Sequence, residues 1–292
     1  MLTQKDYKII TNSFGRKLTE DEVLDMLKNN VVGMIAGVEP LTKRVLESVK
    51  SLRVISRCGI GLDSVDTDVA QKLNIKVFNT PSAPVAAVAE LTIALILDVL
   101  RKVSQTDRTI RQGYWKQFMG SLLASKTVGV IGCGRIGSKV SKLLKAFNAQ
   151  VLVTDQRHVL VAPDIINCQL DELLNRSDII TLHIPYGPST HHFIQHERIM
   201  KMKAGSILIN ASRGGLIDEQ ALFNALQSGH LAGAGLDTFE EEPYNGPLIT
   251  LPQVVLTAHM GSYAKETRTQ MEREAAENLL EGLTAAGLFD KM

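Results

Sequence analysis

Three segments of the sequence carry side chains that could move a proton and bind a carboxylate. "INASRGG" contains Arg213, "GLDTFEEEP" contains three consecutive glutamates, and "LTAHMGS" contains His259. A histidine exchanges a proton near neutral pH, and a carboxylate behind it fixes the ring and favours its charged form. An arginine offers planar two-point recognition of a carboxylate. Together these residue types indicate acid–base chemistry on a small anionic molecule.

Each of these side chains also has an ordinary structural explanation. Arg213 could form a surface ion pair, and His259 could be a buried histidine with satisfied hydrogen bonds. Three glutamates before a proline are typical of a solvated loop. A function is favoured because all three segments lie at the ends of predicted strands, and ligands of open parallel sheets bind outside the carboxyl ends of strands. Spacing alone does not choose among Glu240, Glu241 and Glu242.

A fourth segment, "VGVIGCGRIGSKV", has the pattern of a phosphate-binding loop. Its Gly-x-Gly-x-x-Gly run, from Gly132 to Gly137, follows β-branched residues and precedes a helical pattern. Glycines there permit a tight turn and close approach of the backbone to a pyrophosphate that faces the helix N-terminus. The alternative is a glycine turn that serves only to pack the helix. The context favours a dinucleotide site.

The strand after this loop ends at Asp155. An acid at that position accepts hydrogen bonds from the adenosine ribose hydroxyls and repels a 2′-phosphate. The sequence therefore predicts NAD rather than NADP as the cofactor. Arg157 is a residue that could weaken this preference, because a nearby arginine can accommodate the phosphate.

The rest of the pattern supplies the elements that would position these residues. Short apolar runs alternate with helical patterns, which indicates parallel sheets covered on both faces. Residues 85–113 are predicted to form one long helix, apolar in its first half and charged in its second. The other predicted helices are 41–50, 68–74, 135–147, 170–177, 218–229 and 262–283, and the predicted strands are 31–38, 53–56, 75–79, 127–132, 150–155, 178–184, 205–212, 233–237 and 253–260.

Composition limits the class of protein. The chain has 292 residues, enough for about two domains, and 32 basic side chains balance 31 acidic ones. This near-neutral charge argues against nucleic acid or an anionic membrane as a partner. We find no apolar run of about 18 residues and no secretory signal at the start. Three cysteines without metal-site spacing predict reduced thiols, no metal and a cytoplasmic location.

The motifs together resemble the D-isomer-specific 2-hydroxyacid dehydrogenase family, most closely its phosphoglycerate dehydrogenase-like branch. The stretches "SRCGIGLDSVD", "VFNTPSAPVAAVAELT", "LHIP" and "LINASRGGLIDEQAL" complete the resemblance, which covers the chain from about residue 16 onward. It implies an α/β protein with two Rossmann-like, doubly wound parallel-sheet domains. The substrate domain would comprise residues 1–97 and 265–292, the inserted NAD-binding domain residues 98–264, and the active site would lie in the cleft between them.

The resemblance also assigns roles to residues. Arg213, Glu242 and His259 would be catalytic, so that Glu242 points inward while Glu240 and Glu241 are solvated. Asp237 would lie at the nicotinamide carboxamide. The complete set of expected cofactor-binding residues is Thr80, Gly132, Gly134, Arg135, Ile136, Gly137, Asp155, Ile184, Ala211, Ser212, Arg213, Asp237, His259 and Gly261.

The segment "SRCGIGLDSVD" is expected to bind the substrate together with Arg213. Backbone N–H groups at Ile60 and Gly61 would hold its carboxylate, and Arg57 resembles a phosphate ligand of phosphoglycerate dehydrogenases. Arg57 could instead be a solvent-facing arginine at a strand end. We therefore expect a small 2-hydroxy or 2-keto acid, with D-3-phosphoglycerate as the first candidate and hydroxypyruvate or glyoxylate reduction as the alternative.

A different class of function stays open. The same scaffold could serve as an NADH-sensing binding protein or an inactive remnant, since the chain is expected to lack the family's usual first strand and helix. The helix after the adenosine-binding strand is expected to be short, and no C-terminal regulatory domain is expected. A formate dehydrogenase is disfavoured because that branch has glutamine at the position of Glu242. The family implies a homodimer, with "QGYWKQF" around Trp115 as a contact arm.

Overall fold

In the computed structural model, residues 8–157 and 162–288 are described. The chain divides into two units, Met1–Pro84 with Ala264–Met292 and Val85–Tyr263. The first boundary lies before Val85, whereas the family resemblance led us to expect a boundary after residue 97. It lies earlier because the apolar side chains after Pro84 pack on the sheet of the second unit, including Val88, Ile93 and Val99.

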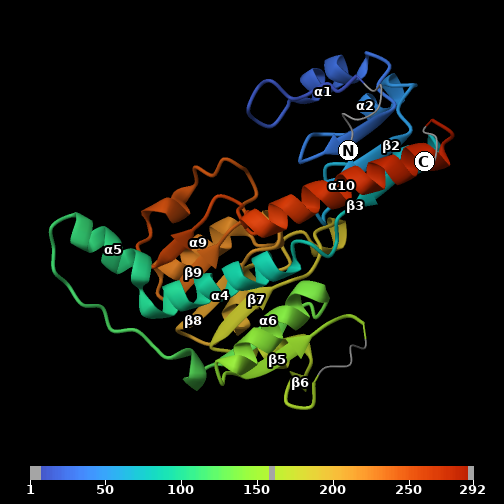
Figure 1. The fold of residues 1–292 in the computed structure, drawn as a ribbon. Coiled ribbons are helices and arrows are strands. Elements are labelled where there is room, and N and C mark those ends of the chain that lie inside the picture. Colours follow the sequence, from blue (N-terminus) through green and yellow to red (C-terminus); the bar gives the residue numbers. More distant parts are fainter. Residues whose placement is uncertain (1–7, 158–161, 289–292) are drawn as a thin grey trace. The chain divides into compact units, whose positions relative to one another are not determined.

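The first unit is a small parallel sheet covered on both faces (Figure 1). Val54 packs with Leu279 and Leu283 of the long C-terminal helix, while its neighbour Ile55 joins the apolar cluster of the N-terminal helices. This alternation follows from the two-residue period of a strand. In chain order the elements are α1 (Glu20–Leu27), β1 (Gly33–Ala36), α2 (Lys43–Ser48), β2 (Val54–Arg57), α3 (Thr67–Lys72), β3 (Lys76–Asn79) and α10 (Lys265–Ala285).

Three helices of the first unit, α1, α2 and α3, begin at side-chain caps. Thr19 and Glu22 form a reciprocal capping box at the start of α1. Thr42 accepts from the N–H of Val45 in α2, and the Asp66 carboxylate accepts from the first turn of α3. Such caps satisfy N–H groups that have no partner within the helix.

The second unit alternates strands and helices through almost its whole length. Its elements are α4 (Val85–Arg101), α5 (Val103–Arg111), β4 (Thr127–Ile131), α6 (Arg135–Ala146), β5 (Gln150–Thr154), β6 (Ile166–Asn167), α7 (Leu170–Arg176), β7 (Ile179–Leu182), α8 (His196–Lys201), β8 (Ser206–Asn210), α9 (Glu219–Gln227), β9 (Leu231–Leu236) and β10 (Val254–Leu256). The short 3₁₀ turns are η2 (Leu123–Ser125), η3 (Pro188–Thr190), η4 (Gly214–Leu216) and η5 (Pro247–Thr250).

In the described part of this unit, seven strands form one parallel sheet in the order β10-β9-β8-β7-β4-β5-β6. The chain runs outward from β4 through β5 to β6, then returns to the other side of β4 at β7. One apolar cluster places α4 and α6 on one face, and another places α7, α8 and α9 on the opposite face. This is the doubly wound arrangement in which the ligand site lies where the strand order reverses.

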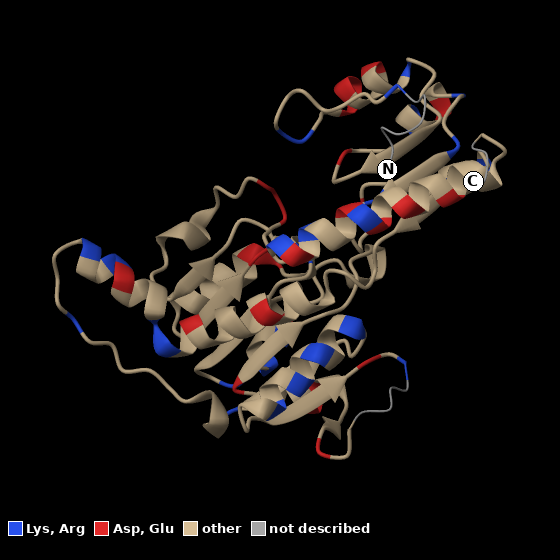
Figure 2. Ribbon diagram, viewed as in Figure 1, with Lys and Arg blue, Asp and Glu red and all other residues tan. Residues whose placement is uncertain are grey.

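The distribution of charge agrees with these layers. Figure 2 shows α4 as mostly uncharged, whereas basic and acidic residues alternate along α10. Nine residues of α4 are buried, among them Ala89, Leu95 and Ile96. Among the described residues, none of the helices has the length and apolar character that crossing a bilayer requires.

The predicted single helix over residues 85–113 is wrong, because it is two helices. Lys102 separates them in a left-handed conformation, with φ at 56°. The Asp98 carboxylate accepts a hydrogen bond from the N–H of Ser104 at 2.8 Å and another from its hydroxyl. This side chain satisfies the first turn of α5 and so stabilises the break. The second helix has no buried residue that would favour a straight continuation.

Several regions of the chain differ in secondary structure from what the sequence pattern predicted. Between β5 and β6, residues 155–157 and 162–165 form no helix, and residues 158–161 of the expected short helix lie outside the described residues. The sequence pattern did not predict α1, α8 or the two-residue strand β6. Residues 8–19 contain no helix or strand.

Candidate active site

Six loops of the second unit share one edge of the sheet. Since all seven strands are parallel, the loops that follow β4, β5, β7, β8, β9 and β10 leave the sheet on the same side. They carry all the predicted site residues of this unit. The fold therefore gathers side chains that are more than a hundred positions apart in the sequence.

His259 and Glu242 form a hydrogen-bonded pair at this edge. Nδ1 of His259 lies 2.9 Å from Oε2 of Glu242, and Oε1 of Glu242 accepts from the backbone N–H of Phe239 at 3.1 Å. Burial alone would raise the pKa of Glu242, but the hydrogen bond and charge of His259, the Phe239 N–H and the charge of Arg213 together lower it. Glu242 is therefore held as a carboxylate beside the imidazole.

The loop that carries His259 is fixed by Asp237, at the end of β9. One carboxylate oxygen of Asp237 accepts from the Thr257 hydroxyl at 2.6 Å and the Met260 N–H at 2.8 Å, and the other from the Gly261 N–H at 2.8 Å. The side chain is fully buried. The family resemblance implied a nicotinamide contact for Asp237. In the structure its carboxylate anchors the backbone on the C-terminal side of His259.

Asn210 does the same for the loop that carries Arg213. Its side chain donates to the carbonyl of Arg213 at 2.8 Å and accepts from the N–H of Ser212 at 3.0 Å. Ser212 in turn donates its hydroxyl to the carbonyl of Leu182 at the end of β7, at 2.6 Å. Asn210 is fully buried at the end of an apolar strand. The sequence pattern did not single it out, although a lone amide directly after the apolar run "SILI" is a signal that could have identified it.

The loops after β8 and β9 are also packed directly against each other. A Cβ on Gly214 would lie 1.8 Å from the backbone of Phe239, so only glycine fits there. Phe239 belongs to the glutamate segment, and Gly214 follows Arg213 in the chain. This contact fixes the separation between the arginine loop and the loop of Glu242.

The three glutamates differ in their surroundings. Glu241 is exposed, as expected. Glu240 is exposed as well, but it pairs its carboxylate with Nε2 of His192, while its backbone N–H donates to Glu219 at 2.8 Å. Among the described residues, Glu242 is the glutamate that contacts His259. The side chains of Glu240 and Glu242 are 35% and 38% exposed, so the two differ in the histidine that each one contacts and not in their burial.

The glycine loop after β4 fits a dinucleotide phosphate. Gly132 has φ at 92°, and a Cβ on Gly137 would lie 1.9 Å from the carbonyl oxygen of Gly132. Gly134 caps α6 without a side-chain hydrogen bond, and the nearest atom to a Cβ placed there is a nitrogen of Arg157 at 3.7 Å. The first turn of α6 thus presents N–H groups across an open surface, which suits an anion.

Asp155 lies directly beside this loop. Its carboxylate accepts from the N–H of Cys133 at 2.7 Å and from the N–H of Arg157 at 2.9 Å. The Nε of Arg157 is 3.4 Å from the same carboxylate, and the arginine side chain is 76% exposed. Burial opposes these contacts, which nevertheless lower the pKa of Asp155. The acid is therefore fixed and charged, with an arginine next to it.

The other expected cofactor residues occupy the same loops. Arg135 and Ile136 open α6. Ile184 follows β7 and packs against the apolar cluster under α7 to α9. Ala211 is 7% exposed, at the end of β8. Within the described residues, no group of three His, Cys, Asp or Glu side chains is arranged to hold a metal ion.

Arg57, Ile60, Gly61 and Thr80 belong to the first unit. The carbonyl of Gly59 accepts from the N–H of Thr80 at 3.0 Å, and the carbonyl of Ile60 accepts from the side chain of Asn79 at 2.8 Å. The guanidinium of Arg57 folds over Gly59 and donates to the carbonyl of Cys58. The Thr80 hydroxyl is buried and has no hydrogen-bond partner among the described residues.

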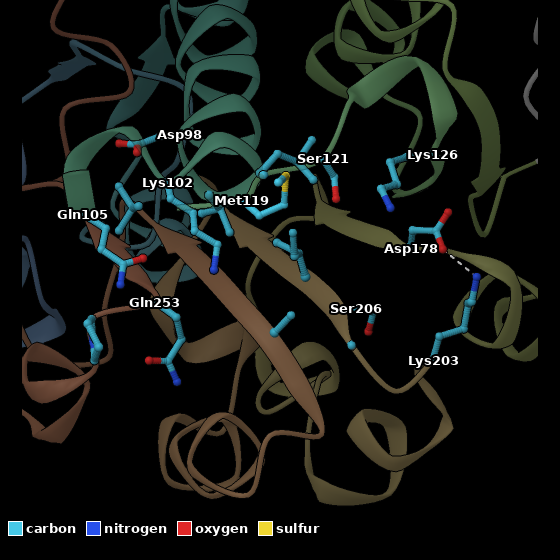
Figure 3. A pocket seen from close by; sticks show the side chains of 18 of the residues that line it. Asp98, Lys102, Gln105, Met119, Ser121, Lys126, Asp178, Lys203, Ser206 and Gln253 are labelled. Atoms are coloured by element: carbon cyan, nitrogen blue, oxygen red, sulfur yellow. Dashed lines mark hydrogen bonds and ion pairs between the residues drawn. The ribbon is translucent and has the colours of Figure 1, made fainter. Parts of the chain in front are cut away.

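A pocket of about 280 Å³ lies at the opposite edge of the second unit's sheet (Figure 3). Its walls include Lys126 and Asp178, which precede β4 and β7, and Ser206 at the start of β8. Figure 3 shows Lys203 paired with Asp178 at this end. The pocket therefore lies away from the carboxyl ends that carry His259, so this cavity does not mark the candidate site.

The fold and these loops define a dinucleotide-binding protein with a histidine–carboxylate pair. Comparisons with known proteins show the family to which it belongs. Residues 93–261 match the family described as "D-isomer specific 2-hydroxyacid dehydrogenase, NAD binding domain". The chain belongs to this family. The match confirms the family and the α/β Rossmann fold predicted from the sequence, and NAD as the cofactor of its binding domain.

Individual relatives agree at the level of the family. The chain is 39% identical over 274 residues to a D-3-phosphoglycerate dehydrogenase from Methanocaldococcus jannaschii, a match that covers 90% of this chain and 51% of the relative. It therefore spans about half the length of that relative. It is 36% identical to a hydroxypyruvate reductase from Thermotoga maritima, covering 91% of this chain and 89% of the relative.

A solved structure supports the same fold. The D-lactate dehydrogenase from Aquifex aeolicus, in complex with NAD and lactic acid, has a TM-score of 0.82 and 31% identity, covering 92% of this chain and 87% of the other. The relatives thus carry the names of dehydrogenases and reductases. They support the predicted enzyme class, an oxidoreductase acting on a CH–OH group, while their names include several different acids.

Proposed function

We propose that the chain is an NAD-dependent D-2-hydroxyacid dehydrogenase that interconverts a small D-2-hydroxy acid and its 2-keto acid. The observation that carries this proposal is the His259–Glu242 pair, 2.9 Å apart, beside a glycine loop that fits a dinucleotide. Arg213 follows the neighbouring strand, and its charge lowers the pKa of Glu242. These three residues form the catalytic set in the proposal.

The hydrogen bond to Glu242 assigns different tasks to the two ring nitrogens of His259. Nδ1 carries the proton that Glu242 accepts, which leaves Nε2 as the nitrogen that meets the substrate. In the oxidation direction Nε2 takes the proton of the hydroxyl group, and in reduction it returns a proton to the carbonyl oxygen. The carboxylate keeps the ring oriented through both directions.

Arg213 and the cofactor complete the reaction. The guanidinium of Arg213 binds the substrate carboxylate and polarises the reacting carbonyl. Hydride transfer is the chemistry that the nicotinamide supplies when bound. The remaining residues predicted to bind the cofactor hold it in place. Asp155 favours NAD, because its fixed carboxylate lies where a 2′-phosphate would be repelled.

For the substrate, the first candidate is D-3-phosphoglycerate. The N–H groups of Ile60 and Gly61 have no acceptor among the described residues, while the neighbouring carbonyls are occupied. Two adjacent N–H groups of this kind can bind a carboxylate. Arg57 is the proposed phosphate ligand. The Thr80 hydroxyl, buried without a partner, is a proposed cofactor contact.

A hydroxypyruvate or glyoxylate reductase is the second candidate. The observation in its favour is the position of Arg57, whose guanidinium bonds to the carbonyl of Cys58 and lies over Gly59. An arginine held in this way would have to turn before it could bind a phosphate. The hydroxypyruvate reductase relative also matches this chain over 89% of its own length.

A binding protein without turnover is the candidate of another class. It would keep the dinucleotide loop, so cofactor binding alone does not distinguish it. The complete His259–Glu242 pair favours an enzyme, since a sensor of NADH has no need of a proton acceptor.

We also propose a homodimer located in the cytoplasm. Residues 114–122 carry large apolar side chains on the surface, with Trp115 86% exposed and Met119 92% exposed. Such side chains are expected to be covered by a second copy. Sedimentation of the wild-type protein and a Trp115→Ala variant would test the dimer. The location rests on the three free cysteines and is tested by cell fractionation.

The deciding experiment is a substrate panel. Purified protein with NADH is offered 3-phosphohydroxypyruvate, hydroxypyruvate, glyoxylate and pyruvate, and NADH consumption is followed by absorbance. We expect turnover, with the highest kcat/KM for the phosphorylated acid. The highest value for glyoxylate or hydroxypyruvate would select the second candidate. NADH binding without turnover of any acid would select the binding protein.

A further inference from the structure

A cluster of four carboxylates includes Glu242, one member of the pair that performs the proposed chemistry. Glu240, Glu241 and Glu242 follow one another after β9, and Glu219 contacts the backbone of Glu240. Burial raises the pKa of Glu219, and the charges of the three consecutive glutamates raise it further. The cluster thus has mutual repulsion that a nearby cation would relieve. His259 pairs with one member, Glu242.

His192 pairs with a second member of the cluster. Its Nε2 lies against Oε1 of Glu240, and the two side chains are 32% and 35% exposed. The backbone N–H of His192 donates to the carbonyl of Gly215 at 2.8 Å, two residues after Arg213. His192 therefore contacts the loop after β8 through its backbone and the loop after β9 through its ring. Its own segment follows β7.

The orientation of the His192 ring is supported from its own segment. The ring stacks on that of His191, with centroids 3.9 Å apart and planes 24° apart. Nδ1 of His191 lies 3.2 Å from the hydroxyl of Tyr186. A Cβ on Gly215 would lie 2.5 Å from the Tyr186 ring, so the tyrosine is packed against the arginine loop. These contacts hold Nε2 of His192 toward Glu240.

Glu240 is consequently held at two points. Glu219 holds its N–H and His192 holds its carboxylate, while the N–H of Phe239, one residue earlier, donates to Glu242. The stacked rings of Phe239 and Tyr244, 4.3 Å apart, close the other side of the segment. A short segment held at Phe239, Glu240 and Tyr244 keeps Glu242 in its place beside His259.

We propose that His192 is a positioning residue of the active site, which holds Glu240 and thereby sets the geometry and charge around the Glu242–His259 pair. This inference rests on the proposed function. The groups that face His192 are Glu240 after β9, and His191 and Tyr186 on its own segment. Without His192, the Glu240 carboxylate is left uncompensated two residues from Glu242. The added negative charge favours the protonated form of His259.

The test is the titration of His259 in the wild-type protein and in His192→Ala, followed by NMR of the imidazole protons. We expect its midpoint to move upward by about half a pH unit in the variant, the size of an exposed ion pair. Because oxidation needs neutral His259, the pH profile of kcat should move upward by the same amount. We expect kcat at neutral pH to fall by up to about threefold, with KM for NADH unchanged.

Two further variants separate charge from simple loss of structure. In a Glu240→Gln background, His192→Ala should leave the midpoint of His259 unchanged, because no carboxylate is left without a partner. His191→Phe keeps a ring for stacking and should also leave it unchanged. If His192→Ala does not fold, His192→Gln takes its place, since its amide donates to Glu240 without charge and should give the same upward movement.

The outcomes decide the inference independently of turnover. No movement of His259 in the His192 variant, an equal movement in the Glu240→Gln background, or an equal movement in His191→Phe would each overturn it. If no acid in the panel is turned over, the proposed function fails. The NMR titration then still shows whether His192 and His259 are coupled through Glu240.

Discussion

The two units both present loops at the carboxyl ends of parallel strands, but they fix those loops in different ways. In the second unit, buried side chains hold the backbone around the reactive residues: Asp237 accepts from Met260 and Gly261 beyond His259, and Asn210 donates to the carbonyl of Arg213. In the first unit, the loop of Gly59 and Ile60 is held through its carbonyls. The second unit therefore fixes its reactive side chains, whereas the first unit leaves backbone N–H groups available.

This difference predicts which kinetic constant should change when residues of each unit are substituted. Proton transfer needs a side chain fixed to within a fraction of an ångström, so buried carboxylate and amide anchors suit it. Recognition of an anion can use backbone N–H groups and the guanidinium of an arginine. Substitutions at the anchored loops of the second unit should therefore lower kcat. Substitutions in the loop after β2 should raise KM.

The largest effect is expected from His259. His259→Ala removes the group that exchanges the proton, and kcat should fall about 10²- to 10⁴-fold. NADH binding, followed by fluorescence, should stay close to wild type because the glycine loop is untouched. Glu241→Gln is the matched control, since Glu241 is an exposed residue of the same edge. If His259→Ala kept the wild-type kcat, the anchored loops of the second unit would have no catalytic role.

Arg57 tests the other side of the comparison. Arg57→Ala should raise KM for the phosphorylated acid about tenfold to a hundredfold, because a charged hydrogen bond is worth about 1.5–3 kcal/mol. Steady-state kinetics with 3-phosphohydroxypyruvate and with glyoxylate would measure it, and glyoxylate should be little affected. Arg213→Ala should impair both acids. Equal weakening of both acids by Arg57→Ala would contradict a phosphate site at this residue.

The expected difference in affinity between NADH and NADPH is smaller than these effects on kcat and KM. Asp155 predicts that NADH binds at least about tenfold more tightly than NADPH, which corresponds to 1.4 kcal/mol. Fluorescence titration with both cofactors measures the ratio, and Asp155→Asn should reduce it. Arg157→Ala should increase it, since the guanidinium lies 3.4 Å from the carboxylate. Equal affinities in the wild-type protein would show that Arg157 offsets the acid.

The smallest effect is a displacement of the pH profile by Glu242→Gln. The amide removes the charge that favours protonated His259, so turnover in the oxidation direction should extend to lower pH. Glu240→Gln should move the profile in the same direction by less, because Glu240 contacts His192 instead. The profile of kcat between about pH 5 and 9 measures this. Identical small displacements for all three glutamates would mean that none is specific to His259.

Glu242 also links stability to pH. Its pKa is lowered in the folded protein, so its interactions contribute fully above the unfolded value, about 4.3. The contribution disappears as the pH falls through the folded value. The difference in unfolding free energy between wild type and Glu242→Gln, measured by urea denaturation, should therefore shrink below about pH 4.

Much of the fold could be read from the sequence. The apolar runs of β4, β7 and β8 are buried on both faces, and such runs alternate with helices in a parallel sheet. The glycine loop followed from local rules, because Gly132 needs a positive φ and Gly137 lies against the carbonyl of Gly132. The position of Arg213, Asp237 and His259 at strand ends followed from the same alternation.

The sequence determined the residue types of the site and the strand ends that carry them, since both depend on short-range patterns. Only the tertiary structure decided that Glu240 meets His192, 48 residues away, and that Asp237 anchors the backbone next to His259. It also decided the break at Lys102, where the Asp98 side chain turns to the next helix. In each of these contacts, a side chain meets a residue that is distant in the sequence or lies beyond a change in chain direction. The geometry of such contacts is set only when the folded sheet brings the loops together.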